Sequence, residues 1–90
     1  MNTLLVSYDL KTPGKDYSKL WEYLKSYNWA KPLESLWLIR TNYSEEQVRN
    51  FIVNGYVDQN DRIFVVDVTA TASAWKNIPA DVIGWIGSTL

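Results

Sequence analysis

Asp9 is the residue best placed to do chemistry, because it lies near the end of an apolar run, Leu4 to Leu10, that leads into the turn residues 11–14. Side chains alternate between the two faces of a strand, so Asp9 shares the less apolar face with Ser7. An acid at such a strand end is either a solvated terminus or a metal-binding or catalytic group. This stretch alone leaves both interpretations open.

The composition restricts that chemistry, because the chain contains neither cysteine nor histidine. Disulfides and thiolate chemistry are excluded, and the usual general base and the commonest metal ligand are missing. A metal held by this chain would be bound through oxygen, which favours Mg²⁺, Mn²⁺ or Ca²⁺ over Zn²⁺. Metal-bound water is therefore the nucleophile that the composition supports, while enzymatic activity itself stays undecided.

Three lysines, Lys11, Lys15 and Lys19, follow Asp9 and are spaced four residues apart. They are candidate contacts to the phosphates of RNA or DNA, or else solvated side chains on an exposed helix face. The net charge of −1 argues against a protein that simply coats nucleic acid. The charge is uneven, because residues 1–40 carry six basic and four acidic side chains, and residues 41–90 carry three and six.

The elements that must position these residues follow in the order strand, helix, bent strand pair, helix, strand and helical tail. Asp16 can cap a first helix whose apolar residues recur with helical spacing to Tyr27. Ser44 and Gln47 have the spacing of a capping box, which begins a second helix that Gly55 ends. Strands are predicted over 4–10, 34–41 and 62–69, with 29–33 as a short edge strand because it contains a proline, and a short helix from residue 79.

This order predicts one α+β domain over residues 1–90, a ferredoxin-like βαββαβ sandwich with a short helical C-terminal tail. The expected strand order is 4-1-3-2 in an antiparallel sheet, with both helices on one face. We expect that covered face to take Leu4, Val6, Tyr8, Leu36, Leu38, Phe64, Val66 and Val68. The open face is then apolar enough to predict a homodimer interface, made of Leu5, Trp37, Ile39, Ile63 and Val65.

We expect a cytoplasmic protein, because no targeting signal is visible in the sequence. No apolar run approaches the roughly 20 residues that a membrane-spanning helix needs. The N-terminus shows no basic region followed by an apolar region and a cleavage site, so we expect no signal peptide and no membrane partner.

The stretch Leu5–Leu10, which contains Tyr8-Asp9, resembles the first strand of Cas2, the small CRISPR-associated protein, and of the Cas2-like "SinR family". The segment Glu34–Trp37 and the strand after Asp61 resemble later parts of the same family, so the likeness covers about residues 1–70. It implies a dimeric ferredoxin-like fold. It also implies that Asp9 matches the metal-site acid of the members that cut RNA or DNA. The sparse basic residues and the tail with Pro79 and Trp85 depart from the family pattern.

Two functions from different classes follow. The first is a metal-dependent endonuclease that acts on RNA or DNA with Mg²⁺ or Mn²⁺ at Asp9, one copy from each subunit of the dimer. Antiparallel neighbours would bring Ser35 and Asp61 close to Asp9, with Tyr8 beside it. The second is a catalytically silent dimeric binding or scaffold module of phage, mobile-element or toxin–antitoxin origin. Base stacking in either could use aromatic residues that otherwise serve the core: Tyr8, Trp21, Trp29, Trp37 and Tyr43.

Overall fold

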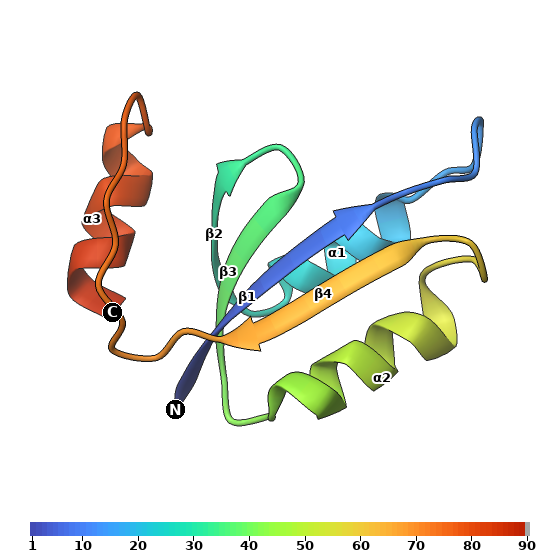
Figure 1. The fold of residues 1–90 in the computed structure, drawn as a ribbon, viewed down its shortest axis with the longest axis horizontal. Coiled ribbons are helices and arrows are strands. Elements are labelled where there is room, and N and C mark those ends of the chain that lie inside the picture. Colours follow the sequence, from blue (N-terminus) through green and yellow to red (C-terminus); the bar gives the residue numbers. More distant parts are fainter. Residues whose placement is uncertain (90) are drawn as a thin grey trace.

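A computed structural model describes residues 1–89 of the chain as a four-stranded antiparallel sheet with three helices. The strands are β1 (Asn2–Asp9), β2 (Asn28–Leu33), β3 (Leu36–Thr41) and β4 (Arg62–Asp67), and their order across the sheet is β2-β3-β1-β4 (Figure 1). The first strand is central, and both of its neighbours run antiparallel to it. The α+β class, the strand order and the helix positions agree with the ferredoxin-like prediction.

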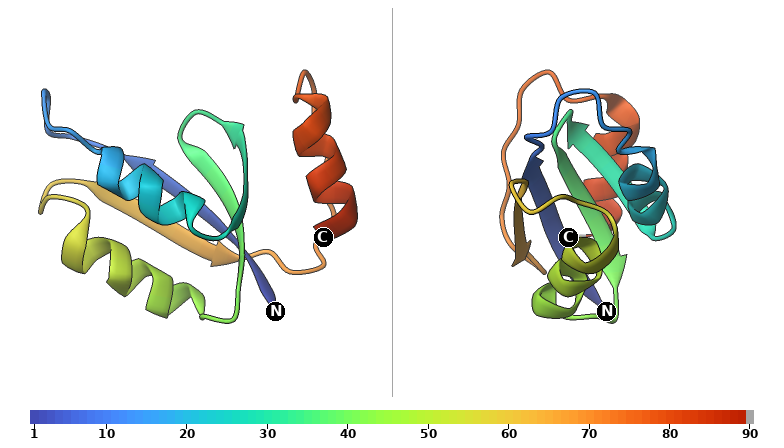
Figure 2. Two further views of the ribbon diagram at one scale, coloured as in Figure 1. Left: turned by 180° about the vertical axis from the view of Figure 1, so that it is seen from behind. Right: turned by 90° about the vertical axis from the view of Figure 1, so that its right-hand side faces the viewer.

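Two helices, α1 (Ser18–Lys25) and α2 (Glu45–Gly55), lie on the same face of the sheet (Figure 2). The capping box at α2 is confirmed, since the Ser44 side chain accepts from the Gln47 amide and the Gln47 side chain accepts from the Ser44 amide. At α1 the N-cap is Tyr17 rather than the predicted Asp16, whose carboxylate accepts from the Ser18 amide at 2.9 Å. These polar side chains satisfy amides that a helix start leaves unpaired.

The main core lies between the sheet and these two helices. It consists of the fully buried Leu4, Val6, Leu20, Leu24, Trp37, Ile39, Val48 and Ile52. Half-buried side chains, among them Tyr8, Ile63 and Val65, pack against its margin.

The predicted face assignment is wrong for β3 and β4. The register sets Val6 opposite Trp37 and Val65, and directly opposed residues of antiparallel strands share a face. Trp37 is therefore buried under the helices, with 1% of its surface exposed. Four members of the predicted open-face surface, Trp37, Ile39, Ile63 and Val65, lie on the helix side, and only Leu5 remains on the opposite face.

The opposite face is itself partly covered by the third helix, α3 (Ala80–Thr89), which lies at the β2 end of the sheet (Figure 1). Val82 and Ile86 of α3 pack on Ala30 and Leu38 in a second buried cluster, with Leu5 at its edge. Phe64 of β4 stays uncovered on this face, with 64% of its surface exposed. No helix within residues 1–89 is long and apolar enough to cross a bilayer.

Candidate functional site

Asp9 ends β1 at the protein surface, and 56% of its side chain is exposed. Its carboxylate forms an ion pair with the Lys11 ammonium at 2.8 Å, and Arg62 is its partner across to β4. A shallow depression of about 370 Å³ adjoins it, lined also by Ser7, Tyr8 and residues 62–64. The acid is thus accessible, but its carboxylate is already paired with one ammonium group.

The residues around Asp9 do not fit a divalent-metal site within one chain. Mg²⁺ needs several oxygen ligands or substrate phosphates in addition to a carboxylate. Within the described part of the chain, Asp9 is the only carboxylate that lines the depression, and it already pairs with an ammonium group. Among residues 1–89, no three histidine, cysteine, aspartate or glutamate side chains are grouped so that they could hold a metal ion.

Asp61, predicted as a neighbour of Asp9, instead joins two loops. Its carboxylate accepts hydrogen bonds from the Lys11 amide at 2.7 Å, the Tyr17 hydroxyl at 2.9 Å and the Asp58 amide at 2.7 Å. Partial burial alone would raise the pKa of Asp61, but these hydrogen bonds outweigh burial and lower the pKa overall. The residue therefore stabilises the loops beside β1 and β4 and makes no hydrogen bond to Asp9.

The three lysines predicted to contact phosphates lie in different settings. Lys11 pairs with Asp9, and Lys15 pairs with Asp58, whose pKa is lowered chiefly by the hydrogen bond from Lys15. Lys19 is exposed on α1. Two of the three ammonium groups are thus already neutralised by carboxylates of the chain.

Tyr8 has a structural role that the strand pattern did not reveal. Its hydroxyl accepts hydrogen bonds from the indole N–H groups of Trp21 and Trp37, both at 3.0 Å, and donates to the Glu34 carbonyl at 3.4 Å. The Tyr8 amide donates to the carbonyl of Ser35, which also accepts from the Ser7 hydroxyl. The hydrogen bonds of Tyr8 and Ser35 therefore fix the turn between β2 and β3 and the side chains of two tryptophans. They do not position the Asp9 carboxylate.

These tryptophans form part of a surface that we call the Trp–Lys surface: Trp21, Lys25, Trp29, Lys31 and Trp37. It lines a depression of about 270 Å³ where α1 meets the outer strand β2. The Trp29 and Trp37 rings lie 5.2 Å apart, and the Lys25 and Lys31 ammonium groups sit 5.6 Å and 5.2 Å from the centroids of Trp29 and Trp37. Trp29 is 38% exposed, so part of its indole remains accessible beside two cations.

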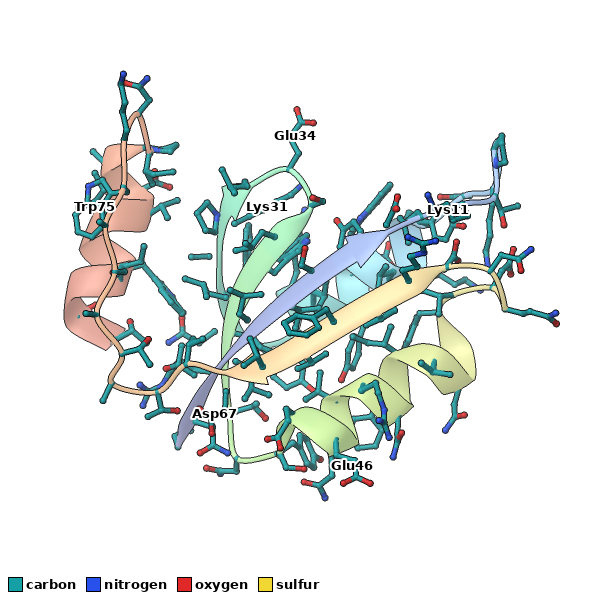
Figure 3. The ribbon with its side chains drawn as sticks, in the orientation of Figure 1. Lys11, Lys31, Glu34, Glu46, Asp67 and Trp75 are labelled. Atoms are coloured by element: carbon teal, nitrogen blue, oxygen red, sulfur yellow. The ribbon has the colours of Figure 1, made fainter. Side chains whose placement is uncertain are left out.

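Only part of this surface was foreseeable. The sequence indicates the tryptophans as candidates for base stacking, but it does not distinguish Lys25 and Lys31 from other surface lysines. The signal was the spacing Lys25-x-x-x-Trp29-x-Lys31, which links the last turn of a helix to an edge strand. Figure 3 shows Lys31 on β2 and Lys11 at the far end of β1, so the two groups of lysines mark separate surfaces.

Comparison with known proteins does not assign this site, since no protein-family model and no solved structure matches the chain.

Proposed function

We propose that this protein is a binding module for single-stranded nucleic acid, and that the strand binds across the Trp–Lys surface. The observation that carries the proposal is an exposed indole, Trp29, in a depression where, among residues 1–89, two lysines are the only charged side chains in the lining. A base can stack on an indole face regardless of its identity, while ammonium groups neutralise the adjacent phosphates. This combination is typical of binding without strong sequence preference.

The architecture supports that surface. Trp37 is buried and fixed by the Tyr8 hydroxyl, so it provides a rigid base on which Trp29 packs. Lys25 lies in the last turn of α1, where its charge also complements the negative end of the helix dipole. Bases in a duplex are already stacked on one another, so single strands should bind more tightly than duplexes.

Replacing Trp29 with leucine is expected to weaken binding of a short labelled oligothymidylate about 5- to 150-fold, measured by fluorescence anisotropy. The reason is that each base–aromatic stack contributes about 1–3 kcal/mol, and leucine keeps apolar bulk without a stacking face. Trp75→Leu is the matched control, because Trp75 is also exposed but lies outside the Trp–Lys surface. An equal loss in both variants would contradict the assigned surface.

The lysines are tested by salt dependence in the same assay. Changing Lys25 and Lys31 together to glutamine should reduce the slope of log Kobs against log salt by about 1.4, because each single-strand phosphate contact contributes about 0.7. The same double change at Lys11 and Lys19 tests two of the three lysines predicted from sequence; the third, Lys15, pairs with Asp58. A larger change in slope from that second pair would move the interface to the Asp9 end of the sheet.

A metal-dependent nuclease of the Cas2-like kind is the second candidate. It is favoured by the exposure of Asp9 at the end of the central strand and by the predicted sheet order. Because one chain does not supply the ligands of a metal site, this function requires a second copy that brings another Asp9 close to the first. The proposal therefore depends on a homodimer, which is also a prediction.

Asp9→Asn separates the two candidates. In a nuclease, the change should abolish Mg²⁺- or Mn²⁺-dependent cleavage of labelled RNA and DNA, because it removes the charge that attracts the metal. The fold should be nearly unaffected, since Asp9 is exposed and its ion pair contributes little to stability. Cleavage by the variant at the parent rate, or in excess chelator, would refute this mechanism. If the parent protein binds single strands without cutting them, the result favours the binding module over the nuclease.

A further inference from the structure

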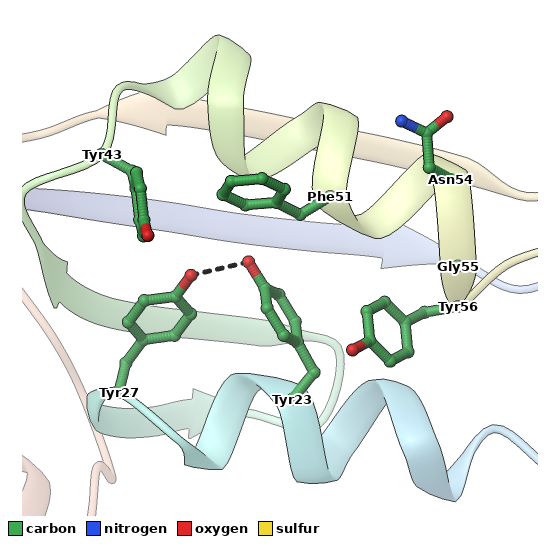
Figure 4. Close-up of a pocket in the computed structure, with 7 residues that line it drawn as sticks. All are labelled: Tyr23, Tyr27, Tyr43, Phe51, Asn54, Gly55 and Tyr56. Carbon is green, nitrogen blue, oxygen red and sulfur yellow. Dashed lines mark hydrogen bonds between the residues drawn. The ribbon is translucent and has the colours of Figure 1, made fainter.

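A second aromatic site lies between the two helices, away from the Trp–Lys surface. It is a groove of about 530 Å³ that we call the tyrosine groove, lined by Tyr23, Tyr27, Tyr43, Phe51, Asn54, Gly55 and Tyr56. Figure 4 shows the rings of Tyr43 and Phe51, from the start and middle of the α2 segment, facing those of Tyr23 and Tyr27 from the α1 side. Five aromatic rings therefore surround one groove.

The rings are held in two kinds of pair. Tyr43 and Phe51 meet edge to face with centroids 5.0 Å apart, and Tyr23 stacks on Tyr56 at 4.8 Å. A hydrogen bond of 2.7 Å joins the hydroxyls of Tyr23 and Tyr27 across the base of the groove. Burial raises the pKa of both hydroxyls, so both stay neutral near pH 7.

The groove lacks the lysine ammonium group that lies over three aromatic rings elsewhere in residues 1–89. Lysine ammonium groups sit over Tyr17, Trp29 and Trp37 at 5.0–5.6 Å from the ring centroids. None of the seven residues that line the tyrosine groove is charged, and no lysine or arginine of residues 1–89 sits over its rings. Aromatic faces carry negative electrostatic potential, so a neutral groove of five rings attracts a poorly hydrated cation.

We propose that the tyrosine groove binds a small organic cation with a quaternary ammonium group and a neutral polar tail, such as choline. The methylated ammonium fits the ring faces because it is large, apolar at its surface and weakly hydrated. The hydroxyls of Tyr43 and Tyr56 have no hydrogen-bond partner among the described residues, and the Asn54 amide adds a further polar group. A phosphate-bearing zwitterion fits less well, because no basic side chain lines the groove.

Phe51 and Tyr43 are the residues to change, because they form the exposed rim, at 41% and 44% exposure. Phe51→Leu keeps an apolar side chain but removes the ring, and Phe51→Tyr keeps the ring. Both substitutions should leave the urea unfolding midpoint close to that of the parent. A change in binding can then be attributed to the groove.

The experiment is an NMR titration of the aromatic resonances with choline and with 3,3-dimethylbutan-1-ol, its neutral isostere. We expect saturable shifts of the groove tyrosines, with choline binding about tenfold more tightly than the isostere. Phe51→Leu should lose that preference and Phe51→Tyr should retain it. Equal binding of the two compounds, or a choline preference unchanged in Phe51→Leu, would overturn the proposal. So would binding only to phosphatidylcholine vesicles, or no saturable shift at all.

Discussion

Trp37→Glu is expected to unfold the domain, with a loss of more than about 4 kcal/mol in the free energy of unfolding. Trp37 is fully buried between the sheet and the helices, so the substitution removes a large ring from the core and places an unpaired carboxylate there. A 90-residue domain has a total stability of about 5–10 kcal/mol, of which this loss is a large part. Far-ultraviolet circular dichroism and a urea titration measure the effect directly.

Phe64→Glu is the matched control, since it introduces the same charge at an apolar position of the opposite face that is 64% exposed. The free energy of unfolding should change by less than about 1 kcal/mol. Comparing Trp37→Glu with Phe64→Glu also distinguishes the loss of folding from the loss of a dimer. A folded Trp37→Glu monomer would contradict the burial of Trp37 and restore the sequence-based dimer surface, whereas a folded Phe64→Glu protein with reduced mass would point to a dimer through the open face.

The face assignment of Trp37 shows what the sequence could and could not predict. Element order and strand order followed from periodicity, a capping box and turn residues. The register did not, because β3 and β4 carry apolar side chains on both faces: Trp37 and Ile39 on one side of β3, Leu36 and Leu38 on the other. A shift of one residue then exchanges the faces without exposing an obviously polar row.

The packing of α3 is a second reason why the predicted dimer surface was wrong. The sequence predicted a short helix after Pro79 but not where it would pack. Val82 and Ile86 cover Leu38 on the face that would otherwise be open, so the face could be apolar at that end without a second subunit. Long-range packing of this kind leaves no periodic signal in the strands that it covers.

The sequence predicted the position of Asp9 on the central strand but not the partners of its side chain. Asp9 is at the exposed end of the central strand as expected, but its carboxylate pairs with Lys11, and Arg62 rather than Ser35 or Asp61 lies opposite it in the strand register. These contacts depend on rotamers and loop conformations that strand alternation does not determine. The Trp–Lys surface was predicted only in part for a similar reason, because it joins α1, β2 and β3 through side-chain orientations that the sequence pattern does not determine.

Tyr8→Phe is expected to cost about 2–3 kcal/mol, although it removes a single oxygen atom. That oxygen accepts from the indole N–H groups of Trp21 and Trp37 and donates to the Glu34 carbonyl. The Trp37 donor is buried and would lose its partner, which alone costs about 1–3 kcal/mol, whereas half-buried Trp21 can turn to water at a smaller cost. Urea unfolding followed by tryptophan fluorescence measures both the stability and the change in indole environment.

Tyr27→Phe is the control for Tyr8→Phe, because among residues 1–89 the Tyr27 hydroxyl pairs only with the Tyr23 hydroxyl in the tyrosine groove. The Tyr27→Phe substitution should therefore cost about 1 kcal/mol or less. The two variants also differ in their expected effect on binding. Loss of the Tyr8 hydroxyl loosens Trp37, on which Trp29 packs, so single-strand affinity should fall even though Tyr8 lies outside the Trp–Lys surface. An affinity equal to that of the parent, with Tyr8→Phe as stable as Tyr27→Phe, would show that the hydroxyl does not position the stacking surface.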